Sequence, residues 1–151
     1  PDPITVSGQR FLDQGNRHIK EGASHPPYNS IPATSGWHYS GFGLAPAPWG
    51  VYDTVLEDEI LVHNLEHGGI GIHYDCPNGC EALLEILRSV AQQALGSGLK
   101  VIMSPYPEMA FPFALTAWNY LDTFHELDLQ RVKDFITFHH ASGNAPEAWA
   151  P

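Results

Sequence analysis

The sequence is poor in basic residues and lacks any long apolar run. Seven Lys and Arg stand against seventeen Asp and Glu, which gives a formal net charge of -10. An acidic chain without a basic stripe repels phosphate backbones, so the composition argues against nucleic acid as a partner. No apolar run approaches the roughly 18–20 residues that span a bilayer, and we expect no membrane insertion by these residues. The acidic charge instead favours the approach of cations.

Cysteine is scarce as well. The only two are Cys76 and Cys80, and Pro, Asn and Gly lie between them. These three residue types favour a tight turn, so a local disulfide is the expectation if the compartment is oxidising. A reduced redox or metal-binding pair and two free thiols are the alternatives. The chain starts at Pro1 rather than at Met, and we expect a mature or trimmed form whose signal peptide or anchor has been removed.

The length and composition fit one globular domain. The 151 residues are 43% hydrophobic, which is enough for a core and leaves little room for a second domain. We expect a single domain over 1–151, with 1–20 and 141–151 peripheral. Gly and Pro number 14 and 13 and indicate many turns. The nine His are a high count for a short chain, and His is the commonest metal-ligating side chain.

The hydrophobic pattern predicts an α+β fold. Residues 24–50 are rich in Pro, Gly and aromatic residues, which indicates a long N-terminal loop that is irregular but ordered. Helical spacing of apolar residues predicts helices over 81–95 and 128–139, the second with Asp128 as N-cap. Short apolar runs predict strands at 60–62, 70–74, 100–104 and 113–118. We therefore expect a small mixed sheet, two main helices and a loose tail at 141–151.

The segment from His63 to Gly69 is the best functional clue. His63 and His67 are four residues apart, which brings two side chains together on a helix but leaves them about 13 Å apart on an extended strand. Since strand-like runs flank the segment, the pair chelates one ion only if the chain bends there. Gly68 and Gly69 make a bend plausible. Two His that pack or titrate independently on a strand are the alternative.

The same segment spells H-x-x-E-H, the inverted zinc-protease pattern, in which Glu66 would activate water. That pattern needs a helix, and the strand-like flanks argue against one. Glu66 is therefore better interpreted as a carboxylate that hydrogen-bonds to a metal-ligating His and orients its ring, or as a turn residue.

Further metal donors are dispersed along the chain. His25 and His38 lie in the long loop, where functional residues are common. Met109 lies in a proline-rich loop, and a thioether beside imidazoles favours copper over zinc because soft sulfur selects Cu(I). Core filling is the alternative role for this Met.

Several motifs together resemble those of the DUF3105 family, bacterial proteins of unknown function. The matching blocks are Tyr28-Asn29-Ser30-x-Pro32-Ala33-Thr34-Ser35-Gly36-x-His38, His63-x-Leu65-Glu66-His67-Gly68-Gly69, Pro105-x-Pro107 and Ala117-Trp118. Members typically look secreted or membrane-anchored, so the resemblance implies an extracytoplasmic location. It also points to His25, His38, His63, His67 and Met109 as the positions to watch. Ala33 and Trp37 stand where Pro is usual, and neither change removes a possible ligand.

These observations predict an extracytoplasmic metal-binding protein that acts as a chaperone, buffer or sensor. Copper is the expected ion, with zinc as the alternative. The expected partners are the metal ion and a membrane-bound or periplasmic protein. Two other functions stay open: a metal-dependent hydrolase or oxidase that uses Glu66, and a metal-free binding module that uses the aromatic stretch 37–49 as its contact surface. The expected ligands are His38, His63 and His67, completed by Met109 or His25.

Overall fold

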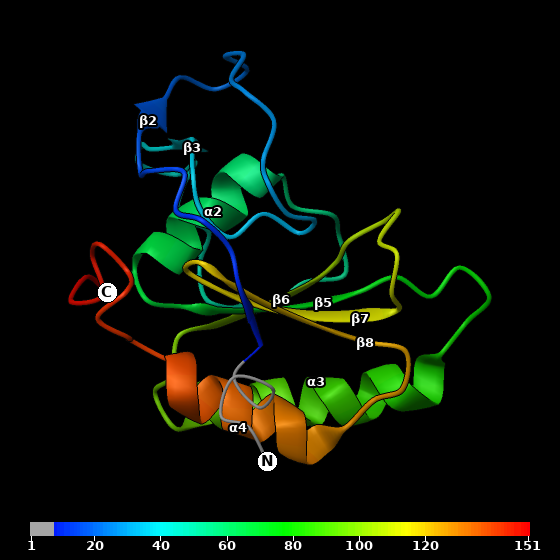
Figure 1. Ribbon diagram of the computed structural model, residues 1–151. Helices are drawn as coiled ribbons and strands as arrows, with labels where there is room; N and C mark the ends of the chain where they lie inside the picture. The colour runs from blue at the N-terminus through cyan, green and yellow to red at the C-terminus, as the bar shows by residue number, and fades with distance from the viewer. Residues whose placement is uncertain (1–7) are drawn as a thin grey trace.

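A mixed six-stranded sheet forms the centre of the computed structural model, which describes residues 8–151 (Figure 1). The strand order is β1-β8-β7-β5-β6-β4. Strands β4, β5 and β6 run parallel, whereas β5–β7, β7–β8 and β1–β8 are antiparallel. The strands are β1 (Gln9–Arg10), β4 (Gly50–Val51), β5 (Ile70–Tyr74), β6 (Val101–Pro105), β7 (Phe113–Ala117) and β8 (Tyr120–Phe124).

Two helices cover one face of this sheet, α3 (Glu81–Gly96) and α4 (Leu129–His139) (Figure 1). Both helices were predicted, and Asp128 caps α4 by accepting a hydrogen bond from the Arg131 amide. Alternate residues of β5, including Ile70 and Ile72, contribute to the apolar core beneath them, as the two-residue period of a strand requires. The structure is a single α+β domain with a mixed sheet, as the sequence predicts.

The other face is covered by helix α2 (Asp58–Glu66) and the N-terminal segment (Figure 1). The predicted strand at 60–62 is therefore wrong. The β-branched residues there suggest a strand, but Asp58 and Glu59 occupy the first helical turn, where acidic side chains favour a helix. Leu61 and Leu65, four residues apart, are both buried, which is helical spacing.

Gly68 and Gly69 allow the chain to turn after His67, rather than between His63 and His67. Gly68 adopts φ +82°, which the chain needs to leave the helix. Gly69 lies so close to Trp49 that a Cβ would stand 2.3 Å from the indole ring. The predicted bend therefore follows the motif, and His63 and Glu66 are helical.

The N-terminal segment adds a second, two-stranded sheet from β2 (His18–Ile19) and β3 (His38–Tyr39). Most of 24–50 is irregular but ordered, and Ala33, Ser35 and Tyr39 are buried. The first seven residues of the predicted peripheral segment 1–20 lie outside the described residues. Among the residues that are described, no helix combines the length and the apolar character that crossing a bilayer requires.

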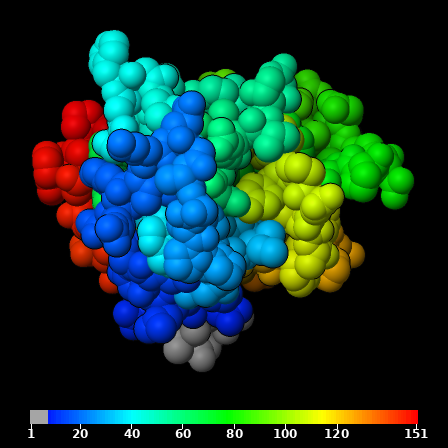
Figure 2. Space-filling view, turned by 90° about the horizontal axis from the view of Figure 1, so that it is seen from above, coloured from blue at the N-terminus to red at the C-terminus, as the bar shows by residue number. Residues whose placement is uncertain are grey.

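The tail 141–151 is not loose. Its Ala145 and Ala150 are buried, and the amide of Ala141 donates to the Gly68 carbonyl oxygen at 2.8 Å. Lys100 Nζ donates to the carbonyl oxygens of Ala148 and Ala150. In the view from above, the tail in red lies beside the blue N-terminal segment (Figure 2). The segment around β3 and the tail thus both contact helix α2, through Tyr39 and Glu147.

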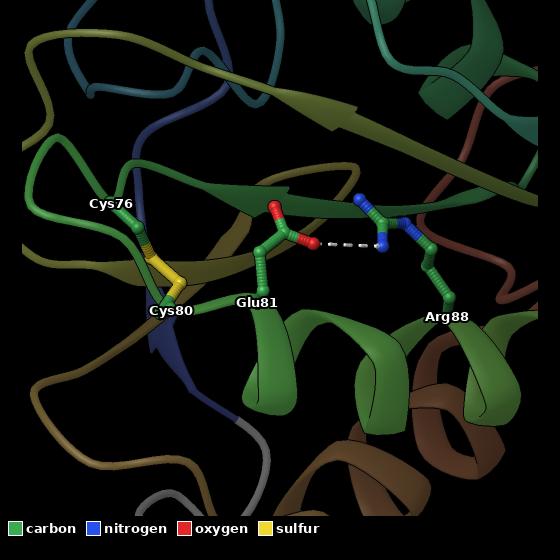
Figure 3. The surroundings of a disulfide bond; sticks show 4 residues. All are labelled: Cys76, Cys80, Glu81 and Arg88. Atoms are coloured by element: carbon green, nitrogen blue, oxygen red, sulfur yellow. Dashed lines mark ion pairs between the residues drawn. A yellow bond between two sulfur atoms is a disulfide. The ribbon is translucent and has the colours of Figure 1, made fainter.

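The predicted disulfide is present between Cys76 and Cys80, with Cα atoms 5.8 Å apart. It closes the turn that joins β5 to α3, directly before the ion pair between Glu81 and Arg88 on α3 (Figure 3). No free cysteine remains in the described residues, so the reduced-pair alternatives do not hold in this structure.

Candidate functional site

Three elements that are distant in sequence, β2, β3 and α2, bring imidazoles together at the end of α2. Parallel pairing of β2 with β3 sets His18 opposite His38. The last turn of α2 carries His63 and Glu66, and His67 follows as its C-cap residue. The ring centroids of His38 and His63 lie 5.0 Å apart, and those of His63 and His67 lie 4.8 Å apart. Four imidazoles therefore gather at one point.

Main-chain oxygens fix the orientation of three of these rings. His38 Nδ1 lies 2.8 Å from the Gly36 carbonyl oxygen, and His63 Nδ1 lies 2.6 Å from that of Tyr39. His67 Nδ1 lies 3.0 Å from the main-chain oxygen of Pro151. A carbonyl oxygen only accepts, so each Nδ1 must carry the proton and donate it. In the neutral form of the three rings, the Nε2 lone pairs are thereby left for another partner, as in most metal-ligating histidines.

Two of these lone pairs face each other. His63 Nε2 and His67 Nε2 are 3.2 Å apart. With both Nδ1 atoms protonated, neither neutral ring has a proton to place between them. Burial, together with nearby His38 and His67, lowers the pKa of His63, which favours its neutral form. Two ligands of one tetrahedral ion with bonds of 2.0–2.1 Å are about 3.3 Å apart, so the spacing suits a bound metal.

Glu66 lies at the centre of the cluster. Its Oε1 is 3.1 Å from His38 Nε2, 3.4 Å from His18 Nε2 and 3.8 Å from His63 Nε2. The side chain is only 1% exposed. Burial on its own would raise the pKa of Glu66, but the adjacent His38 and Glu147 groups lower it to about 2. A buried carboxylate that stays ionised is a strong ligand for a cation.

The tail supplies a second carboxylate. The Glu147 amide donates to the Glu66 carbonyl oxygen at 2.9 Å, and Glu147 Oε2 lies 3.7 Å from His67 Nε2. The neighbouring Glu66 carboxylate raises the pKa of Glu147. One ligand atom from each of His18, His63, Glu66 and Glu147 can be chosen so that all four lie within 4.8 Å of one another.

Two polar atoms of the cluster are buried without a hydrogen-bond partner in the part of the chain that the structure describes. They are His38 Nε2 and Glu66 Oε2. A buried polar atom without a partner is costly, so both atoms are free to contact a ligand. The cluster also lies at the C-terminal end of α2, where the partial negative charge of the helix favours a cation.

Two residues predicted as ligands lie elsewhere. His25 contacts Glu59 at 3.3 Å, near the start of α2, and stacks on Trp37. The Met109 amide donates to Asp75, which follows β5, whereas His67 precedes this strand. Five strand residues span roughly 16 Å, so Met109 is at the opposite end of β5 from the cluster. The structure brings together His38, His63, His67 and Glu66 but not these two.

Sequence reasoning missed two members of the cluster, His18 and Glu147. His18 has no motif around it, and only the pairing of β2 with β3 shows its place. Glu147 belongs to a tail whose Gly, Pro and Ala content indicates a loop. No local pattern could have found either residue, because both reach the site through long-range contacts.

An apolar cavity of about 820 Å³ adjoins the cluster through His63. Its wall is formed by the loop 40–48 together with Tyr52, Leu56 and Ile60. Asn64 fixes this loop, since its side-chain amide donates to the Ala47 carbonyl oxygen and accepts from the Ala47 amide. The aromatic residues of 37–49 do not form one exposed surface, because Tyr39 is buried while Phe42 is fully exposed.

Comparison with known proteins gives a family but no characterised relative. No curated protein and no solved structure matches the chain. A family model described as "Protein of unknown function (DUF3105)" matches residues 18–151, a stretch that contains every residue of the cluster. The chain belongs to the DUF3105 family.

Proposed function

We propose that the protein binds a divalent transition-metal ion, with His63 and His67 as the central ligands. One observation carries this proposal. The two Nε2 atoms lie 3.2 Å apart while each Nδ1 is occupied by a main-chain oxygen. Two neutral acceptors repel at that distance, whereas a cation between them makes the arrangement favourable. Glu147 and Glu66 supply the carboxylates beside this pair.

The donor set narrows the choice of ion. All donors in the cluster are imidazole nitrogens and carboxylate oxygens, which suit Cu(II) and Zn(II). The preference for copper over zinc depended on a thioether, which selects Cu(I), but Met109 lies at the other end of β5 from the cluster. We therefore propose Cu(II), with Zn(II) as the alternative, rather than Cu(I).

The exposure of the cluster supports a role in carrying or sensing the metal. The His18 side chain is 49% exposed and that of Glu147 is 35% exposed, whereas His38 and Glu66 are buried. An ion could enter and leave from the side of His18 and Glu147. The disulfide supports an extracytoplasmic location, because such bonds persist in oxidising compartments.

The test is calorimetric titration of the metal-free protein with Cu(II), Zn(II) and, under anaerobic conditions, Cu(I). We expect binding of the divalent ions and a loss of about 10- to 100-fold in affinity in His63→Ala and His67→Ala. His25→Ala and His125→Ala are matched controls that remove an imidazole outside the cluster, and both should bind as the parent does. Equal affinity in all four variants would refute the proposal.

A metal-dependent hydrolase is the second candidate, because the cavity beside His63 could hold a substrate next to the ion. H-x-x-E-H lies on the last turn of α2, with His67 as the C-cap residue, which weakens the objection to the zinc-protease pattern. However, the Glu66 side chain is only 1% exposed and does not line that cavity, so its carboxylate is poorly placed to activate water beside a substrate there. The zinc-loaded protein should be assayed on ester and peptide substrates. Activity that Glu66→Gln abolishes while it retains zinc would support the enzyme.

A further inference from the structure

We propose that the cluster is a two-metal centre in which Glu66 bridges two ions. The first position is the one defined above by His63, His67 and Glu147. The second is formed by His18, His38 and Glu66 Oε1. This inference deepens the proposed function and rests on it, because it concerns the number of ions that the same cluster holds.

The second position shows the same arrangement of acceptor atoms as the first, with its imidazoles on β2 and β3. His38 Nδ1 donates to the Gly36 carbonyl oxygen, so in the neutral ring, the form that binds a metal, Nε2 carries a lone pair. That lone pair is 3.1 Å from Glu66 Oε1, which is also an acceptor. Both side chains are buried, and His38 Nε2 has no hydrogen-bond partner among the described residues. A cation between the two acceptors satisfies both atoms.

His18 completes this second position. Its Nε2 is 3.4 Å from the same Glu66 oxygen, and its ring centroid is 4.7 Å from that of His38. Ligand atoms of one ion are separated by about 3–4 Å when each bond is about 2.1 Å long, so these spacings fit. The pairing of β2 with β3 sets the two residues opposite each other.

Glu66 joins the two positions. Its Oε1 faces His18 and His38, and the same oxygen lies 3.8 Å from His63 Nε2 of the first position. Its second oxygen, Oε2, is buried and has no hydrogen-bond partner in the described part of the chain. Carboxylates bridge metal pairs separated by about 3.5–4 Å. The cluster offers four imidazoles and two carboxylates, more donors than one tetrahedral ion takes.

The experiment counts ions. Metal-free protein is saturated with Zn(II) or Cu(II), freed of excess by gel filtration, and measured by native mass spectrometry and elemental analysis. We expect two metal ions per chain in the parent, one in His38→Ala and one in His67→Ala. The double variant His38→Ala/His67→Ala should hold none. His38→Gln, which keeps a polar side chain at a buried position, should also hold one. His125→Ala should hold two.

Copper adds a readout that depends on the distance between the ions. Two Cu(II) ions bridged by a carboxylate couple magnetically, so the integrated paramagnetic resonance signal of the parent should fall well below its copper content. In His38→Ala the single ion should give its full signal. One equivalent in the parent that both single variants lose would overturn the two-metal centre and leave the proposed function intact. Absence of metal from the parent would overturn both. Circular dichroism of each variant verifies that it is folded.

Discussion

The main-chain amide of Glu147 donates a hydrogen bond to the carbonyl oxygen of Glu66 at 2.9 Å. This bond fastens the C-terminal segment to the last residue of helix α2, so a site built at a helix end receives a carboxylate from the far end of the sequence. The segment also supplies the oxygen of Pro151 that holds the His67 ring. The tail therefore provides both a donor and the support for another donor.

Replacing Glu147 tests whether its carboxylate is a ligand. Glu147→Ala should weaken metal binding by at least about 10-fold, the lower end of the usual cost of losing a group that only supports a metal ligand. The fold should change little, because the main-chain bond to Glu66 does not need the side chain. Calorimetric titration measures the affinity, with Glu126→Ala as the control because that exposed acid lies outside the cluster. An unchanged affinity would place Glu147 outside the coordination shell.

Local pattern predicted most of the fold. The helices at 81–95 and 128–139 and the strands at 70–74, 100–104 and 113–118 have strong periodicity, and all are confirmed to within a residue or two. Strand β8 was missed because Asp122 interrupts its apolar residues. Its buried carboxylate is explained only by tertiary structure, in which Arg131 pairs with it.

The candidate site was predicted only in part, because local sequence patterns reveal some of its residues and tertiary contacts place the others. The family motifs contain His38, His63, Glu66 and His67, and short-range spacing relates the last three. The secondary structure of that segment was nevertheless wrong, since Ile60 and Val62 favour a strand locally and packing of α2 on the sheet overrides that preference. His18 and Glu147 depend on strand pairing and on the tail, which a single sequence does not reveal.

The burial of His73 should make the free energy of unfolding depend on pH in the acidic range. This buried residue on β5 lies 3.1 Å from Ser104 Oγ, and burial lowers its pKa from 6.5 to about 4. Between these values the unfolded chain takes up a proton that the folded chain does not. The part of the stability that depends on neutral His73 should thus be fully present above pH 6.5. It should fall as the pH drops towards 4, by about 3 kcal/mol at 1.36 kcal/mol per pH unit.

The measurement is urea unfolding of metal-free protein at several pH values. His73→Asn keeps a donor for Ser104 but cannot ionise, so its stability should lose this part of the dependence. The difference between parent and variant separates the effect of His73 from that of Glu66. Because the pKa of Glu66 is lowered from 4.5 to about 2, its contribution to stability is lost only below pH 4.5. Parallel curves for the two proteins between pH 6.5 and 4 would contradict the assignment.

Removal of the disulfide should affect stability but not metal binding. The bond between Cys76 and Cys80 closes a very short loop, and loop-closure entropy gives it about 2 kcal/mol. It lies beyond the C-terminal end of β5, whereas the cluster precedes the N-terminal end. The double variant Cys76→Ser/Cys80→Ser should therefore unfold at lower urea and bind metal as the parent does. A loss of affinity would show that the two ends of β5 are coupled.

A side chain at Gly69, in the junction between α2 and β5, should lower the stability of the protein. A Cβ there would lie 2.3 Å from the Trp49 indole and 2.9 Å from the Asn64 carbonyl oxygen. Gly69→Ala should destabilise the protein by about 1–3 kcal/mol, the usual cost of overpacking, as measured by urea unfolding. Gly96→Ala is the matched control, because a Cβ at the end of α3 meets nothing within 4 Å and Ala favours a helix.

Combining Gly69→Ala with Trp49→Phe separates the two contacts. A smaller ring removes the clash with the indole but leaves the carbonyl oxygen of Asn64 in place. The double variant should thus lose less stability than the sum of the two single variants. Simple additivity would mean that the backbone contact dominates. Since Asn64 directly follows His63 on α2, metal affinity should fall together with stability in Gly69→Ala and stay at the parental value in Gly96→Ala.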